Sequence, residues 1–92
     1  MNVSVVAAAV DGGVRIQGRA LDVTRYSVSL EAQHRFQVGA LLHLHFELPG
    51  DEPPVEVQGV VVHHRQDAPA GVRYVEFSEA ELSRLWKSIT PA

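Results

Sequence analysis

Residues 40–48 (ALLHLHFEL) constrain the fold more than any other segment, because their apolar side chains recur at every second position. In a β-strand successive side chains point to opposite faces, so a period of two predicts a strand with one buried face. In a helix, with about 3.6 residues per turn, the apolar and the polar side chains of this segment would be mixed on every face. The expected inner face consists of Leu42, Leu44, Phe46 and Leu48, and the outer face of Leu41, His43, His45 and Glu47.

Similar segments recur along most of the chain and are separated by residues that favour turns. Turns or loops are predicted at 11–13 (DGG), 22–27 (DVTRYS), 33–39, 49–54 (PGDEPP) and 67–71 (DAPAG). Glycine, proline and short polar side chains break strands, each for its own conformational reason. Strands are predicted at 2–10, 14–23, 27–30, 40–48, 55–64 and 72–77. Six short strands in this arrangement predict an antiparallel β-barrel or curled sheet.

The period of the apolar residues changes after residue 77. Ser78 and Glu81 have the spacing of a capping box, and Phe77 and Leu82 that of a hydrophobic staple. One apolar helix face then consists of Leu82, Leu85, Trp86 and Ile89. These features predict a C-terminal helix over about 79–89, covering an open edge or one end of the barrel.

Composition limits the class of protein. A chain of 92 residues holds one domain, here expected over 1–92 with the barrel at about 2–77. It has no cysteine, and its net charge of −3 argues against a DNA or RNA partner. No apolar run reaches the roughly 20 residues of a membrane helix, and no basic stretch precedes the apolar residues 3–10. We therefore expect a soluble, cytoplasmic domain without membrane insertion.

The histidines suggest a metal site, and the serines suggest a nucleophile. His43 and His45 share a strand face, whereas the adjacent His63 and His64 point to opposite faces. The favoured interpretation of the pair is an exposed polar face; alternatives are a shared metal ion or an interface that responds to protonation. Neither Ser27, Ser29 nor Ser83 has a recognisable base. We predict no enzyme activity, no catalytic residue, no metal and no cofactor.

Four stretches in order carry a family resemblance: Asp22-x-Thr24-x-x-Ser27, 36–49 (FQVGALLHLHFELP), 59–62 (GVVV) and 72–77 (VRYVEF). With this order and spacing, roughly residues 14–89 resemble the PilZ domain, the bacterial receptor module for cyclic di-GMP. The resemblance implies a six-stranded antiparallel β-barrel with one C-terminal helix. This agrees with the fold predicted from the periodicity.

The resemblance also implies a ligand site, from which this sequence departs. The family holds cyclic di-GMP with an R-x-x-x-R arm before the first strand and with a D-x-S-x-x-G turn. Asp22 matches that turn, Thr24 keeps a hydroxyl, and Ser27 replaces the glycine, which would strain the backbone if the position needs a positive φ. Residues 1–13 contain no Arg or Lys, and the first strand is expected to begin at residue 2. We therefore expect a degenerate member without the arginine arm.

Three arginines could replace the arm. Arg15 and Arg19 have the spacing R-x-x-x-R, but they fall on a predicted strand and lie about 13 Å apart there. The favoured interpretation is a pair of solvated side chains; the alternative is direct binding of phosphate. Arg25, beside Asp22, is either a ligand contact or a solvated residue at the tip of the turn, and the sequence favours neither.

Two functional hypotheses follow. The favoured one is an adaptor that acts through a protein partner of a signalling or motility pathway, with weak or absent nucleotide binding. Its interface candidates are Tyr26, Leu85 and Trp86. The favoured interpretation of Trp86 is a core residue, and Leu85 and Trp86 become interface anchors if the apolar face of the helix is wider than the barrel can cover. Tyr26 could equally fold over the barrel mouth. The same surfaces allow a homo-oligomer. The alternative is a true cyclic di-GMP effector, with Asp22, Thr24, Arg25, Ser27, Arg15 and Arg19 as ligand-binding candidates and a positive patch around the turn.

Overall fold

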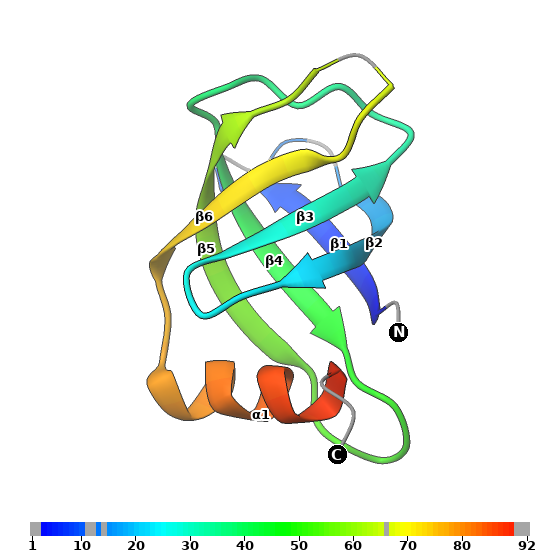
Figure 1. Ribbon diagram of the computed structural model, residues 1–92, viewed down its shortest axis with the longest axis vertical. Helices are drawn as coiled ribbons and strands as arrows, with labels where there is room; N and C mark the ends of the chain where they lie inside the picture. The colour runs from blue at the N-terminus through cyan, green and yellow to red at the C-terminus, as the bar shows by residue number, and fades with distance from the viewer. Residues whose placement is uncertain (1–2, 11–12, 14, 66, 90–92) are drawn as a thin grey trace.

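Six antiparallel strands close into a barrel, and one helix lies across its lower end in the computed structural model (Figure 1). The structure describes residues 3–10, 13, 15–65 and 67–89. Residues 88 and 89 are described without their side chains. The elements are β1 (Val3–Ala9), β2 (Arg15–Val23), β3 (Ser27–Ala32), β4 (Leu41–Glu47), β5 (Val55–His63), β6 (Ala70–Glu76) and α1 (Glu79–Ile89). Around the barrel the strands follow the order β1-β2-β3-β6-β5-β4.

This architecture confirms the six-stranded barrel and the C-terminal helix predicted from the sequence, with two differences in length. β3 continues to Ala32, and β6 begins at Ala70 inside the segment predicted as a turn. The early start has a packing reason: Ala70 is fully buried and pairs with Leu30 of β3. The next residue is glycine because a Cβ on Gly71 would overlap the ring of His63. Part of the predicted hairpin turn, Asp11 and Gly12, lies outside the described residues.

The barrel interior is filled by the inward faces of all six strands. The predicted inner face of β4 is buried as expected, with Leu44 and Phe46 fully enclosed. Burying side chains of this size contributes about 1.5–3 kcal/mol each. Other fully buried strand residues of the barrel include Val5, Leu30, Val55, Val61, Ala70 and Val72. The stability of the domain therefore rests on the alternation that the sequence shows.

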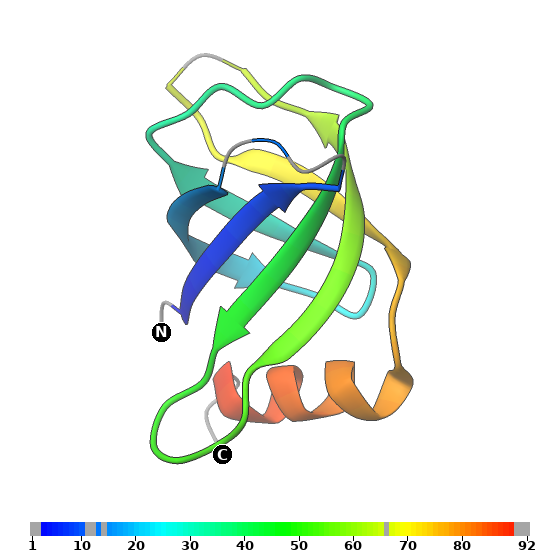
Figure 2. The ribbon, with the colours of Figure 1, turned by 180° about the vertical axis from the view of Figure 1, so that it is seen from behind.

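α1 seals one end of the barrel, where it packs against β5 (Figure 2). Leu85 is fully buried there and Leu82 packs against the core beside it. The Arg84 guanidinium donates to the carbonyls of Pro53 and Pro54, at 2.7 and 3.1 Å, and so fastens the helix to the β4–β5 loop. The helix thus covers an end of the barrel and not an open edge, because the closed sheet has none.

The start of α1 differs from the predicted capping box. The amide of Leu82 donates to the Ser78 carbonyl at 3.0 Å, which begins the helix where expected. The Glu81 carboxylate pairs with Arg84 and does not turn back to the Ser78 amide. Charge pairing along the helix has replaced the reciprocal cap. No helix in the described part of the chain is long and apolar enough to cross a membrane.

Candidate functional site

The β2–β3 turn is held together by one hydroxyl group. The Thr24 amide donates to the Ser27 carbonyl at 2.8 Å and closes the turn. Thr24 Oγ1 accepts hydrogen bonds from the amides of Tyr26 and Ser27, at 3.1 and 3.0 Å. Its proton can reach the Ser27 carbonyl at 3.3 Å or the Ser27 hydroxyl at 3.1 Å. A hydroxyl offers one proton and two lone pairs, so these contacts use all of its hydrogen-bonding capacity.

Ser27, at the position of the family's glycine, is not strained. The only described residue other than glycine with a positive φ is Asp67. Ser27 instead begins β3 in extended conformation and pairs with Arg73 of β6. The conditional expectation of strain therefore does not apply to this backbone.

A β-bulge precedes the turn. The β2–β3 register shifts between Ala20 and Asp22, so one extra residue, Leu21, is accommodated in β2. Asp22 consequently faces outward, and its side chain has no hydrogen-bond or ion-pair partner among the described residues. Of the short polar side chains in this turn, Thr24 and Ser27 make its hydrogen bonds, whereas Asp22 makes none among the described residues.

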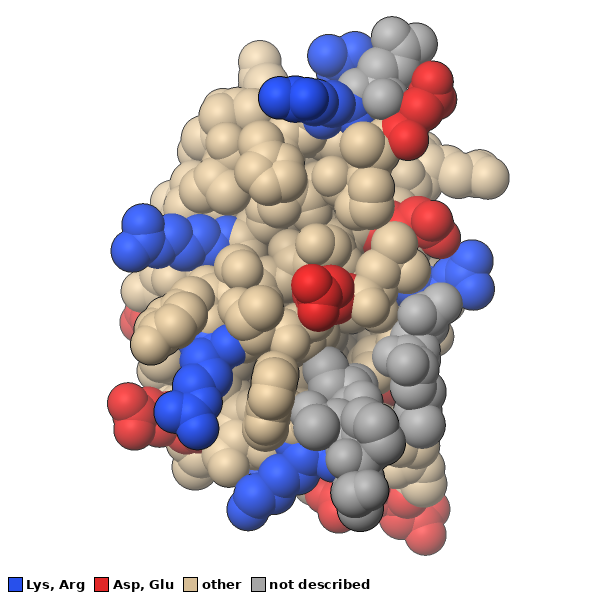
Figure 3. Space-filling model, viewed as in Figure 1, with Lys and Arg blue, Asp and Glu red and all other residues tan. Residues whose placement is uncertain are grey.

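The arginine candidates are not brought together. Arg19 pairs with Glu31 of β3 at 3.2 Å, with the two side chains 60% and 51% exposed, and such a surface pair stabilises the fold little. Arg15 lies opposite Ala8 near the start of β2, seven residues and roughly 23 Å of strand from Asp22. Arg25 is exposed at the turn. Figure 3 shows basic and acidic side chains interspersed over this face, without the predicted positive patch.

A groove of about 330 Å³ separates the β2–β3 turn from α1. Three aromatic side chains that line it are unusually exposed: Tyr26 at 74%, Phe77 at 44% and Trp86 at 39%. The remaining lining residues are Thr24, Arg25, Glu79, Leu82 and Ser83. The turn and the helix, which are far apart in sequence, thus present one amphipathic surface, called here the aromatic groove.

Of the three sequence-predicted interface residues, two line the aromatic groove and one does not. Tyr26 extends outward from the turn, so the alternative of a ring folded over the barrel mouth is wrong. Trp86 also lines the groove, whereas Leu85 is fully buried beneath the helix and offers no surface to a partner. The prediction of Leu85 as an interface anchor is therefore wrong.

The sequence analysis missed Phe77 as a surface residue: it assigned the residue to the end of the last strand and to a hydrophobic staple. The alternation of the predicted strand 72–77 could have indicated it, because an inward Tyr74 places residues 75 and 77 on the opposite face. In the structure β6 ends at Glu76, and Phe77 is 44% exposed just beyond it. The ring of Tyr74 meets that of Phe77 edge-on, with centroids 6.2 Å apart. Burial raises the pKa of Tyr74, and its hydroxyl has no partner among the described residues.

The histidines do not gather around one point. His43 Nε2 and His45 Nδ1 both contact Glu56 Oε1 of β5, at 3.2 and 3.3 Å. These hydrogen bonds, that of His43 first, hold the pKa of Glu56 below its usual range. His63 and His64 lie elsewhere, over Gly71 and beside Phe36. Within the described residues no group of three or more His, Cys, Asp or Glu is arranged to hold a metal ion.

Comparison with known proteins gives one match. A family model described as the PilZ domain matches residues 1–90. No curated protein and no solved structure matches the chain.

Proposed function

The chain belongs to the PilZ domain family, and on that premise we propose that it is a non-enzymatic regulatory domain that acts through a protein partner. The family is a cyclic di-GMP-linked signalling module. In this chain we assign the partner contact to the aromatic groove, and direct binding of the nucleotide is weak or absent.

The aromatic groove is the observation that carries the proposal. Large aromatic side chains supply much of the binding energy in protein interfaces, and here three of them surround one concave surface. Tyr26 and Trp86 each combine an apolar ring with a polar group, which suits a surface that is wet when unbound. Arg25 and Glu79 lie on the rim and can orient a partner through hydrogen bonds. The partner would present apolar side chains to the groove.

The hydrogen bonds within the β2–β3 turn support the proposal that nucleotide binding is weak or absent. The resemblance assigns the hydroxyl at position 24 to the guanine edge, but in this chain it is occupied by the backbone of its own turn. A guanine would have to break at least one of these hydrogen bonds to use it. Arg19 is paired with Glu31, and Arg15 lies too far along β2 to reach the same ligand edge.

The alternative function, a true cyclic di-GMP effector, is favoured by a different observation. Asp22 and Arg25 are both exposed beside the aromatic groove and have no partner among the described residues. A carboxylate can accept from the guanine edge, and a guanidinium can bind phosphate or stack on a base. The rings of Tyr26 and Trp86 offer further stacking surfaces.

Two measurements on the purified domain separate these functions. Isothermal titration with cyclic di-GMP, at low and at physiological salt, should give no saturable heat in the wild type. Saturable binding that is lost in Asp22→Ala would support the effector function instead.

The partner contact is tested by affinity capture from a lysate of the source organism, with quantitative mass spectrometry. A protein retained by the wild type should be lost in both Tyr26→Ala and Trp86→Ala. The matched control is Val62→Ala, because Val62 is also an exposed apolar residue, at 45%, but lies outside the groove. Equal retention by all four proteins would exclude the groove as the contact.

A further inference from the structure

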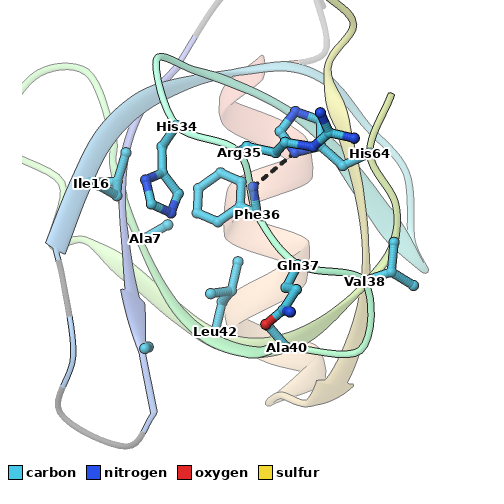
Figure 4. A pocket seen from close by; sticks show the side chains of 11 residues that line it. Ala7, Ile16, His34, Arg35, Phe36, Gln37, Val38, Ala40, Leu42 and His64 are labelled. Carbon is cyan, nitrogen blue, oxygen red and sulfur yellow. Dashed lines mark hydrogen bonds between the residues drawn. The ribbon is translucent and has the colours of Figure 1, made fainter. Parts of the chain in front are cut away.

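The end of the barrel opposite α1 contains a larger hollow, of about 670 Å³ (Figure 4). Its floor is apolar and includes Ile16, Phe36 and Leu42. Its polar lining comes from His34, Arg35 and Gln37 on the β3–β4 connection and from His64 on the β5–β6 connection. The hollow is separate from the aromatic groove and shares no lining residue with it. The functions considered above make no use of it.

Phe36 is fixed in the centre of this hollow. Its side chain is only 6% exposed, and its amide donates to His64 Nδ1 at 2.9 Å. The ring of His34 meets it edge-on, with centroids 4.9 Å apart, and the ring of His64 is tilted against it at 5.9 Å. Three aromatic rings are therefore packed into one preorganised cluster, in which His34 is exposed and Phe36 presents only its edge. Because Nδ1 of His64 accepts, the ring proton lies on Nε2, which leaves a donor for a ligand.

The charged lining of this hollow is basic. Its lining contains Arg35 but neither Asp nor Glu, although the chain as a whole carries a net charge of −3. Arg35 is exposed and has no hydrogen-bond or ion-pair partner among the described residues. An adjoining hollow adds Arg65 together with Glu31 and Asp67. Of these acids, Glu31 is already paired with Arg19.

We propose that this open end of the barrel is a binding site for a small planar aromatic anion, such as an aromatic carboxylate. The ligand ring packs against Phe36 and His34, where edge-to-face and offset contacts are available. Its carboxylate pairs with Arg35, a guanidinium being suited to bidentate recognition of that group. Mouths of β-barrels with an apolar floor and few polar groups are common places for small ligands.

The probe for the test is 2-naphthoate, titrated into the domain by calorimetry and into ¹⁵N-labelled protein by NMR. We expect saturable one-to-one binding, with amide shifts concentrated at residues 34–38 and 64. Arg35→Gln should weaken binding roughly tenfold or more, the usual effect of losing a charged hydrogen bond. The matched control is Arg73→Gln, because Arg73 is an exposed arginine on β6 outside the hollow. It should bind as the wild type does.

A second comparison tests the aromatic part of the proposal. His34→Ala should weaken 2-naphthoate roughly two- to tenfold, the range of one aromatic contact, and should leave the much weaker binding of decanoate unchanged. The neutral 2-naphthol should bind more weakly than the anion. The proposal is overturned if no binding saturates, if the shifts concentrate at the β2–β3 turn, if 2-naphthol binds equally well, or if decanoate equals the aromatic acid.

Discussion

The two ends of the barrel are closed in different ways. At the lower end an eleven-residue helix covers the core and inserts Leu85, which is fully buried. At the upper end the β3–β4 loop covers the core with a single ring, that of Phe36. One hydrogen bond, from the Phe36 amide to His64, holds this loop in place. The helix brings more apolar surface than the core can cover, so Trp86 is left exposed beside Tyr26. The β3–β4 loop brings less apolar surface than is needed to fill the upper end, so a hollow lined in part by Arg35 remains open there.

This difference separates two kinds of surface on one small domain. Surplus apolar area in a shallow groove suits a protein partner, because interface energy is concentrated in aromatic residues. A hollow with an apolar floor and one exposed cation suits a small ligand. A closed sheet alone offers neither, so both proposed sites depend on how the two ends of the barrel are closed.

The largest effect should come from the seal of the upper end. Phe36→Ala should lower the free energy of unfolding by about 3–5 kcal/mol, because the ring is buried and no neighbouring element can replace it. Urea unfolding followed by circular dichroism measures the change. Leu41→Ala is the control: Leu41 is 48% exposed, and its loss should cost no more than about 0.5 kcal/mol. If both variants behaved alike, Phe36 would not seal the barrel.

At the lower end, Leu85→Ala should cost about 2–5 kcal/mol, since it removes the fully buried side chain of α1 and leaves a cavity. The same urea experiment applies, with Trp86→Ala as the paired variant on the exposed side of the helix. The Trp86 variant should lose much less stability while losing the partner. Equal loss of stability in the two variants would contradict the assignment of Leu85 to the core and Trp86 to the groove.

A smaller change in the free energy of unfolding, of opposite sign, is expected for Tyr74. The Tyr74 hydroxyl is buried without a partner among the described residues, and burying such a group costs free energy. Tyr74→Phe should therefore raise the free energy of unfolding by about 1 kcal/mol. A decrease in stability on the same assay would mean that the hydroxyl has a hydrogen-bond partner.

The smallest effect should come from the barrel wall between the ends. Hydrogen bonds from His43 and His45 hold the pKa of Glu56 below 4.5, the usual value for a glutamate. The folded pKa is depressed, so the contribution to stability is present above pH 4.5 and is lost as pH falls through the folded pKa. Glu56→Gln should therefore be slightly less stable than wild type above that window and equal to it at the acid end.

Urea midpoints measured at a series of pH values test this difference, and NMR titration of the Glu56 carboxyl measures the pKa directly. Because Glu56 lies outside both the aromatic groove and the upper hollow, the variant should leave binding at either end unchanged. A pKa at or above the usual value for a glutamate would show that the two imidazoles do not favour the carboxylate.

The barrel was predictable because alternation determines which side chains face inward, as in Leu42, Leu44 and Phe46 of β4. The neighbours of each strand were not predictable, since pairing of β1 with β4 depends on contacts between distant segments. For the same reason the sequence associated Glu47 with the histidine pair, whereas the register places Glu56 of β5 opposite His45. Alternation predicts which face of a strand each side chain occupies. Its partner on the neighbouring strand depends on the register, which alternation does not specify.

The candidate site was predictable only in part. The turn chemistry of Thr24 was within reach of the sequence, because short hydroxyl side chains bond to nearby amides. The bulge that turns Asp22 outward left no mark in the residue pattern. The choice between Leu85 and Trp86 depends on how α1 is rotated over the barrel end, which an apolar stripe containing both residues does not specify.

The most direct test of the central claim is one NMR titration of the ¹⁵N-labelled domain with cyclic di-GMP, at physiological salt and up to millimolar ligand. Amides at both ends of the barrel are observed in the same sample. The account predicts that residues 22–27 show no saturable shift, because the Thr24 hydroxyl stays bound to its own turn. Saturable shifts at Asp22, Thr24 and Ser27, abolished in Asp22→Ala, would contradict it and make the domain a cyclic di-GMP effector.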